Sequence, residues 1–170
     1  MATIPGIGLC RGSLTETPFA DGTVEIQVVP SLMADRSDEA EREFVFSYRI
    51  RITNRTSMLI QVLSRRWDIV DAVGRRRTVE GEGLVGRQPI LGPGQLFQYE
   101  SFCPLETKWG TMEGAFFARA KALSKASSAS SVLDEPWSHR IELQIGRFFL
   151  VAGEASKAEG STPGRVKSRE

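Results

Sequence analysis

Glu43-Phe44-Val45-Phe46-Ser47-Tyr48-Arg49-Ile50-Arg51-Ile52-Thr53 is the stretch that decides the fold, because its side chains alternate in character with a period of two. Large apolar residues fall on one face: Phe44, Phe46, Tyr48, Ile50 and Ile52. Polar residues fall on the other: Glu43, Ser47, Arg49 and Arg51. Successive side chains of a strand point to opposite faces, so the pattern predicts a half-buried antiparallel strand.

Similar alternation recurs on both sides of this stretch. We expect further strands over residues 24–30, 58–70, 75–80, 95–103, 110–117 and 140–151, with turns at 54–57 and 73–74. Residues 58–70 form either one long strand or two strands with a bulge, because Leu63, Trp67 and Ile69 do not keep one phase with Ile60 and Val62. About seven strands with short turns indicate an all-β antiparallel sandwich.

Composition bounds the kind of protein. The chain has 170 residues and 41% hydrophobic residues, which suits one globular domain. A formal net charge of +1 gives no general attraction to nucleic acid or membranes, and no apolar run approaches the roughly 18 residues of a membrane span. The N-terminus does not resemble a secretory signal. Two isolated cysteines and one histidine lack metal-ligand spacing, so we expect no metal and a reducing, cytoplasmic location.

The ends of the domain follow from where large apolar residues stop recurring. We expect a flexible arm over residues 1–20, a sandwich domain over 21–151, and a disordered tail over 152–170. The segment from Ala118 to Ser131 contains five alanines and five serines, and it reads as a short helix or a flexible insertion. We favour a mobile insertion over residues 121–138.

The glycine-rich loop, residues 81–94, holds five glycines and two prolines. Its string Gly81-Glu82-Gly83-Leu84-Val85-Gly86 matches G-x-G-x-x-G, but Arg87-Gln88-Pro89 follows where a dinucleotide site requires a helix. Two interpretations remain. The glycines either shape a long connection between strands, or they present backbone amides to a phosphate or a partner.

Positive charge is concentrated around this loop. Residues 49–87 contain nine arginines against four acids, a local charge of +5. If residues 58–80 form a hairpin, Arg65 and Arg66 and the run Arg75-Arg76-Arg77 could converge to bind an anion or an acidic partner. Alternatively, Asp68, Asp71 and Glu80 neutralise them locally.

Other chemistry-bearing residues stand alone. Trp67 is expected in the core, whereas Trp109 beside Gly110 is expected in an exposed turn where a partner could contact it. His139 is a lone histidine outside any recognisable Cys-His or Ser-His-Asp arrangement, and Ser64 and Ser101 have no His/Asp context for activation. We therefore expect no catalytic residues.

Several segments taken together resemble the ApaG domain family, from about Val24 to Leu150. They are Arg49-Ile50-Arg51-Ile52-Thr53-Asn54, Leu63-Ser64-Arg65-Arg66-Trp67-Asp68-Ile69, the glycine-rich loop, Phe97-Gln98-Tyr99-Glu100-Ser101, and Gly110-Thr111-Met112-Glu113-Gly114. The chain departs from the family pattern at the Ser/Ala-rich insertion, at both tails, and at Ile145-Gly146-Arg147, where family members carry an Ile-Pro or Val-Pro pair.

The resemblance implies a fibronectin type III-like, immunoglobulin-like sandwich, no established enzymatic activity, and protein binding of the kind accepted for eukaryotic members. We expect a non-enzymatic module that binds a protein partner and needs no cofactor. The alternative is a regulator that binds pyrophosphate or a nucleotide through the loop and its arginines. The expected recognition residues are Arg65, Arg66, Gly81, Gly83, Gly86, Arg87 and Trp109.

Overall fold

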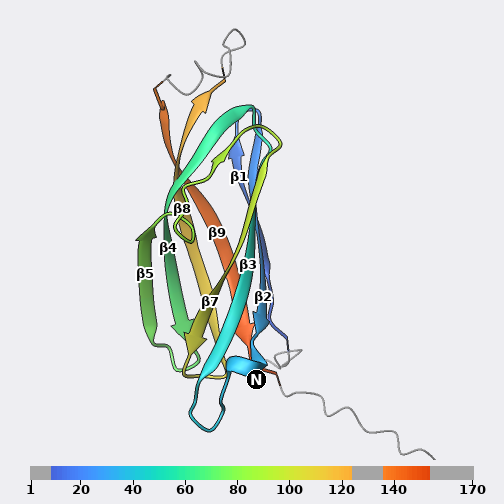
Figure 1. Ribbon diagram of the computed structural model, residues 1–170, viewed down its shortest axis with the longest axis vertical. Coiled ribbons are helices and arrows are strands. Elements are labelled where there is room, and N and C mark those ends of the chain that lie inside the picture. Colours follow the sequence, from blue (N-terminus) through green and yellow to red (C-terminus); the bar gives the residue numbers. More distant parts are fainter. Residues whose placement is uncertain (1–8, 124–135, 154–170) are drawn as a thin grey trace, which may run out of the picture.

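Two antiparallel sheets face each other in the computed structural model, which describes residues 9–123 and 136–153 (Figure 1). The first sheet has the strand order β1 (Ser13–Phe19), β2 (Gly22–Leu32), β3 (Phe44–Asn54) and β7 (Leu96–Leu105). The second has the order β5 (Arg76–Glu82), β4 (Met58–Asp71), β8 (Trp109–Ala122) and β9 (His139–Val151), and the short β6 (Ile90–Leu91) also pairs with β4. A 3-10 turn, η1 (Ala34–Arg36), follows β2.

The all-β sandwich expected from the sequence is confirmed, with its fibronectin type III-like arrangement. All seven expected strands are present, and the described residues contain two more, β1 and β6. The register of β4 against β8 shifts between Val62 and Ser64, so the strand is continuous with a bulge at Leu63. In the described part of the chain, no helix has the length and apolar character needed to cross a bilayer.

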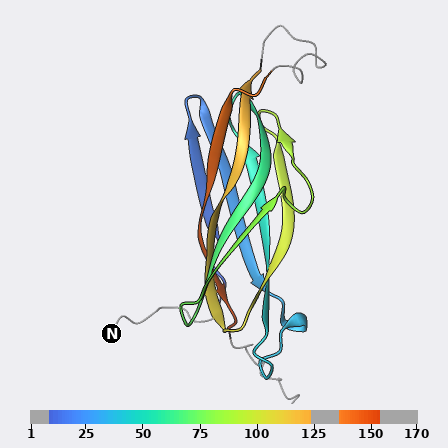
Figure 2. The same ribbon diagram turned by 90° about the vertical axis from the view of Figure 1, so that its left-hand side faces the viewer.

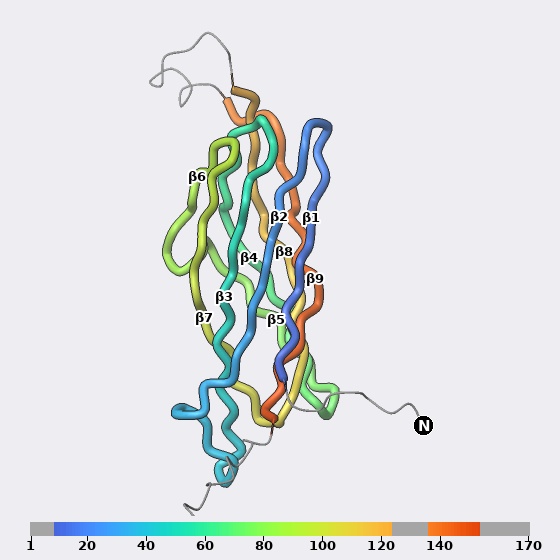
Figure 3. The backbone as a smooth tube through the Cα atoms, turned by 90° about the vertical axis from the view of Figure 1, so that its right-hand side faces the viewer, coloured from blue at the N-terminus to red at the C-terminus, as the bar shows by residue number. Residues whose placement is uncertain are grey.

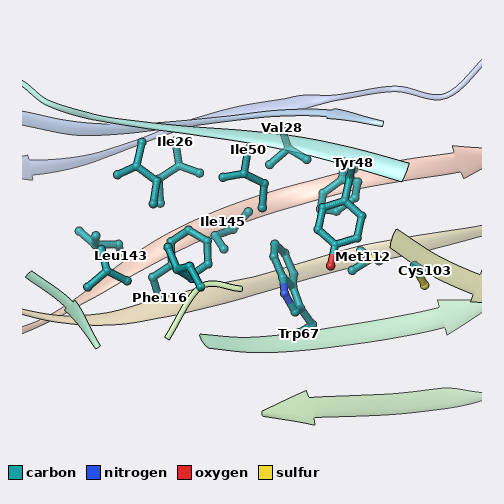
Figure 4. Close-up of a cluster of buried hydrophobic side chains, with 14 of the residues drawn as sticks. Ile26, Val28, Tyr48, Ile50, Trp67, Cys103, Met112, Phe116, Leu143 and Ile145 are labelled. Carbon is teal, nitrogen blue, oxygen red and sulfur yellow. The ribbon is translucent and has the colours of Figure 1, made fainter. Parts of the chain in front are cut away.

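The core lies between the two sheets, and the alternation of β3 supplies one wall of it. Phe46, Ile50 and Ile52 are fully buried there, and β3 pairs with β2 on one side and β7 on the other. Trp67 of β4 is also buried and meets Tyr48, Phe116 and Phe148 edge to face, with ring centroids 5.6–6.0 Å apart. Figure 4 shows Trp67 and Tyr48 entering this layer from opposite sheets.

The N-terminal expectation needs a correction, because Ser13–Phe19 is not part of a flexible arm. It forms β1, which pairs along its length with β2, and Arg11 exchanges two backbone hydrogen bonds with Phe149 of β9. The Gly146 amide also donates to the Thr15 hydroxyl over 2.7 Å. The segment therefore joins both sheets and closes one side of the sandwich, where Figure 3 shows β1 beside β9.

The insertion also begins later than expected. β8 continues to Ala122, and Trp137 folds back to receive the Arg119 guanidinium and the Lys121 ammonium over its ring, 4.5 and 4.7 Å from the centroid. Cation–π contacts of this kind anchor the ring to β8. The rest of the expected insertion (124–135), most of the expected tail (154–170) and residues 1–8 lie outside the described residues.

A buried side chain ties two turns together at one end of the sandwich. The Asn54 amide nitrogen donates to the carbonyls of Met58 and Leu91, over 2.8 and 3.0 Å. Its oxygen accepts from the Thr56 amide and hydroxyl, and its backbone bonds to Gly94 and Gln95. Asn54 is fully buried and fully hydrogen-bonded, so it fixes the β3–β4 turn, β6 and the β6–β7 turn relative to one another.

Replacing Asn54 should cost far more stability than replacing its exposed neighbour Arg55. Asn54→Ala removes four side-chain hydrogen bonds at a buried position, and we expect the free energy of unfolding to fall by about 3 kcal/mol. Arg55→Ala removes only an exposed ion pair with Glu25 and should cost less than about 1 kcal/mol. Urea denaturation measures both. Equal losses would show that the Asn54 hydrogen bonds do not hold this end together.

Candidate functional site

The candidate site is the side of the sandwich opposite β1 and β9, which we call the open side. It lies between β7, the last strand of the first sheet, and β5 with the glycine-rich loop, which border the second sheet. Figure 2 shows the β1–β2 hairpin on one flank of the molecule and β7 on the other. No strand bridges the two sheets here among the described residues, so loops and side chains define this surface.

The glycine-rich loop turns sharply at its centre. Leu84 and Arg87 exchange backbone hydrogen bonds of 2.6 and 3.1 Å across Val85 and Gly86, and both of these central residues have positive φ, 51° and 76°. Gly83 before them has a φ of 65°, and a Cβ there would lie 2.7 Å from the Arg87 carbonyl oxygen. Glycine is therefore required at position 83 by both its backbone angle and its surroundings.

The same loop is bound to the bulge of β4. The Leu63 carbonyl accepts from the Gly83 amide over 2.7 Å and from the Gln88 side chain over 3.0 Å, while the Val62 amide donates to Pro89. Leu84 is fully buried and fills the core between the sheets. The amides of Gly83, Leu84 and Arg87 are thus used within the protein, which favours the interpretation that the glycines shape a connection.

Arg65 and Arg66 lie on opposite faces of β4. The Arg65 guanidinium donates to the carbonyls of Glu82 and Gly83, over 3.0 and 2.8 Å, and lies against Gly81, where a Cβ would come 3.0 Å from its Nη1. Arg66 turns to the outer face and pairs with Asp68 over 3.2 Å. Arg65 therefore supports the loop from inside, and Arg66 faces a different surface.

The expected convergence of all five arginines does not occur. Arg65 is opposite Gly81 in the hairpin, whereas Arg76 is opposite Val70, five residues further along β4 and about 17 Å away at about 3.4 Å per residue. Arg75 is held by Asp71 and Glu106, both over 2.9 Å. The hairpin register thus places Arg75–Arg77 at the other end of the strand pair.

Trp109 also lies away from the loop. It is 47% exposed at the start of β8, beside the β4–β5 turn, and it pairs with Val151 of β9. Of the residues expected to recognise a partner, Gly81, Gly83 and Gly86 shape the loop, and Arg87 is the arginine that the loop itself exposes. Whether any of them binds a partner stays a prediction.

Two hollows mark the ends of the open side. The upper groove, about 620 Å³, lies between residues 87–91 and 95–97. The lower cleft, about 500 Å³, lies between residues 41–43, 75–77 and 104–106. Sequence reasoning missed both hollows, because each is lined by segments far apart in the chain that only the strand pairing brings together.

The described residues hold no recognisable catalytic set. No group of three or more His, Cys, Asp or Glu side chains among them could hold a metal ion. Burial raises the pKa of the Cys103 thiol and of the Cys10 thiol, which opposes formation of a nucleophilic thiolate. The His139 ring lies 2.7 Å from the Ser138 hydroxyl, but both side chains are exposed, and no carboxylate among the described residues bonds to the ring.

Both tyrosines lie on the inner face next to the open side. Burial raises the pKa of Tyr48 and of Tyr99, and the Ser101 hydrogen bond to Tyr48 and the nearby Arg65 charge offset this only in part. The Tyr99 hydroxyl is buried without a hydrogen-bond partner among the described residues. These rings therefore act as core residues that favour the neutral phenol.

Comparison with known proteins finds one family. A family profile described as the ApaG domain matches residues 34–120. A protein named Protein ApaG from Mesorhizobium japonicum is 46% identical over 98 residues, which cover 58% of this chain and 75% of the relative. Protein ApaG from Bordetella pertussis is 43% identical over 101 residues, 59% of this chain and 77% of the relative.

A solved structure shows the same architecture. A crystal structure of a Bordetella pertussis protein described under the name ApaA superimposes with a TM-score of 0.67 at 33% sequence identity. The superposition covers 81% of this chain and all of that chain. The superposed part of the chain is therefore longer than the segment that the family profile matches.

Replacement by alanine should destabilise the protein to different extents at two glycines of the loop, Gly83 and Gly86. A Cβ added at Gly86 meets no atom within 4 Å, so Gly86→Ala is unfavourable only because of the positive φ. We expect the free energy of unfolding to fall by about 1 kcal/mol. Gly83→Ala has a positive φ and also a clash with the Arg87 backbone, and we expect the free energy of unfolding to fall by about 3 kcal/mol. Thermal or urea unfolding distinguishes them. A smaller loss for Gly83→Ala than for Gly86→Ala would rule out this loop conformation.

The tyrosines should not ionise while the protein is folded. Because their folded-state pKa values lie above the unfolded value of about 10, the contribution of the tyrosines to the free energy of unfolding should be constant below about pH 10 and should fall as pH rises further. Tyrosinate absorbance near 295 nm should therefore rise only together with loss of the circular dichroism signal. A gradual rise at about pH 10 with an intact fold would contradict the burial of both rings.

Proposed function

The chain belongs to the ApaG domain family, and on this basis we propose that it is a non-enzymatic binding module that recognises a protein partner at the open side of the sandwich. The observation that carries the proposal is the upper groove. Ile90, Leu96 and Phe97 give it an apolar lining, and Arg87 stands at its border. The groove is open to solvent, which suits a segment of polypeptide better than an enclosed small molecule.

Exposure around the groove supports a protein partner. Ile90 and Leu96 are 42% and 56% exposed, and Val85 at the tip of the loop is also exposed. Neighbouring exposed apolar side chains with a polar border are typical of protein interfaces. The loop that presents them is fixed by the buried Leu84 and by its bonds to β4, so the surface is pre-formed.

A non-enzymatic role is supported from two directions. The described residues hold no recognisable catalytic set, and the relatives carry the name Protein ApaG without the name of a reaction. We further propose a reducing, cytoplasmic setting, which the two free thiols support: Cys103 is buried, and Cys10 hydrogen-bonds to the Val151 backbone.

Binding of pyrophosphate or a nucleotide has weaker support. A phosphate site in this loop would use backbone amides and nearby arginines. The amides of Gly83, Leu84, Arg87, Gly92 and Gly94 are already hydrogen-bonded within the protein, and Arg65 donates to two loop carbonyls. Arg87 alone would remain for an anion on this surface, so we favour the protein partner.

The test combines partner capture with an anion titration. The folded protein is cross-linked in an extract of its source organism, and each captured protein is purified and its affinity measured. We expect Arg87→Glu to weaken binding at least about tenfold, because it reverses the charge at the groove. Arg140→Glu should leave it unchanged, since Arg140 is exposed on β9, away from the open side.

The contrary result is equally specific. Saturable binding of pyrophosphate that is lost in a folded Arg65→Ala or Arg87→Ala protein, with no captured protein affected by Arg87→Glu, would favour the anion-binding regulator. Melting curves of each variant confirm that the fold is retained.

A further inference from the structure

We propose that the free edge of β7 takes an extended segment of the partner, apolar in its middle and acidic at both ends, as an added β-strand. The inference rests on the proposed function and names the form of the partner. It starts from the topology: among the described residues, β7 pairs only with β3. Its other edge faces the open side, as Figure 3 shows.

The backbone groups on that edge can be assigned. Gln95 accepts a hydrogen bond from the Asn54 amide, so the odd-numbered residues of β7 face β3. Pro104 agrees with this assignment. It is even-numbered, and its carbonyl points away from β3 and accepts a hydrogen bond from the Arg77 side chain of β5, over 3.4 Å. The residues that turn their N–H and C=O groups away from β3 are therefore Leu96, Gln98, Glu100 and Phe102.

Apart from the charged Glu100, this stretch lacks the usual protection of an edge strand. Proteins block exposed edges with prolines, inward-pointing charges or a covering loop. Pro104 and Arg77 protect only one end of β7. Between Leu96 and Phe102 the side chains on the solvent face include two large apolar residues, Leu96 at 56% and Phe102 at 59% exposure. An exposed apolar edge of this kind is suited to strand addition.

The size of the free edge fits a short peptide. Leu96 to Phe102 spans about 20 Å at about 3.4 Å per residue. The upper groove borders its first residues, and the lower cleft borders Pro104 and Leu105 just beyond its last. An added strand of eight to ten residues would reach both hollows at about this rise per residue.

The charges at the two ends indicate the chemistry of the segment. Arg87 stands at the upper groove and Arg77 at the lower cleft. Neither has a carboxylate partner among the described residues, whereas Arg75 and Arg66 do. Glu100 in the middle of the edge lies 3.9 Å from Arg49 of β3, across the sheet. Carboxylates at both ends of the segment would complement Arg87 and Arg77, and apolar residues between them would pack beside Leu96 and Phe102.

A proline on the free edge tests the proposal without breaking a backbone hydrogen bond of the folded protein; it removes one exposed side-chain hydrogen bond, which Arg51 donates to Gln98 over 3.3 Å. The Gln98 amide points away from β3, so Gln98→Pro removes a donor that only an added strand would use. The matched control is Glu80→Pro on β5. The Gly83 amide bonds to Leu63 of β4, so the even-numbered residues of β5 face outward in the same way.

The probe is the synthetic peptide Asp-Glu-Val-Thr-Val-Thr-Val-Thr-Glu-Asp carrying a fluorophore, and the measurement is its fluorescence anisotropy against the full chain. We expect saturable binding that weakens with salt, a loss of about tenfold in Gln98→Pro, and no change in Glu80→Pro. The same peptide with alternate backbone nitrogens methylated should not bind, which tests strand pairing without any protein variant.

Three results would overturn strand addition. Equal binding of the methylated peptide, or of a folded Gln98→Pro protein, would place the peptide elsewhere. Concentration-dependent dimers in sedimentation that Gln98→Pro abolishes would make a second copy of the chain the occupant of the edge. Capture of a protein partner that is lost in Arg87→Glu but kept in Gln98→Pro would retain the proposed function and reject this mode of binding, whereas failure of both capture and peptide binding rejects both.

Discussion

The buried amide of Asn54 is the constraint on which the open side depends. Its side chain joins the β3–β4 turn to β6, and its backbone bonds to the turn that leads into β7. The chain leaves the second sheet at β6 and enters the first at β7 within a few residues, so this crossing has to be held rigidly. Four side-chain hydrogen bonds satisfy the buried amide fully and also fix the upper end of the groove.

The two sides of the sandwich are closed in different ways. Near β9, the N-terminal segment pairs with β2 and bonds to β9 through Arg11 and Thr15, which links the two sheets. On the other side, the glycine-rich loop binds β4 through the bulge at Leu63 and covers the core with Leu84, but it makes no strand pairing with β7. The loop therefore covers the core but leaves the outer edge of β7 without a paired strand. The unpaired backbone groups of this edge, held on a rigid surface, are the physical basis of the proposed recognition.

The sequence predicts the strands well because burial on one face imposes a period of two, as in residues 44–52. The break in phase at Leu63 leaves open one long strand or two strands with a bulge, and the structure has one strand with a bulge there. The prediction fails for β1, because residues 1–20 contain three glycines and two prolines and so resemble a loop, although Ser13–Phe19 pairs along its length with β2. The loop arginines show the same limit. Adjacent positions in the sequence suggest a cluster, but neighbours on a strand point apart, and hairpin register separates Arg65 from Arg76. The two hollows depend on such long-range register and leave no local signal.

Amide hydrogen exchange of the free protein, measured residue by residue by NMR, tests the central claim most directly. The amides of Tyr99, Ser101 and Cys103 should exchange slowly because they face β3, and those of Gln98, Glu100 and Phe102 should exchange fast. Gly83 and Arg87 in the loop should be protected by their backbone hydrogen bonds. Uniform protection along β7 would show that its edge is already paired in the free protein, and the open side would then offer no strand for a partner to extend.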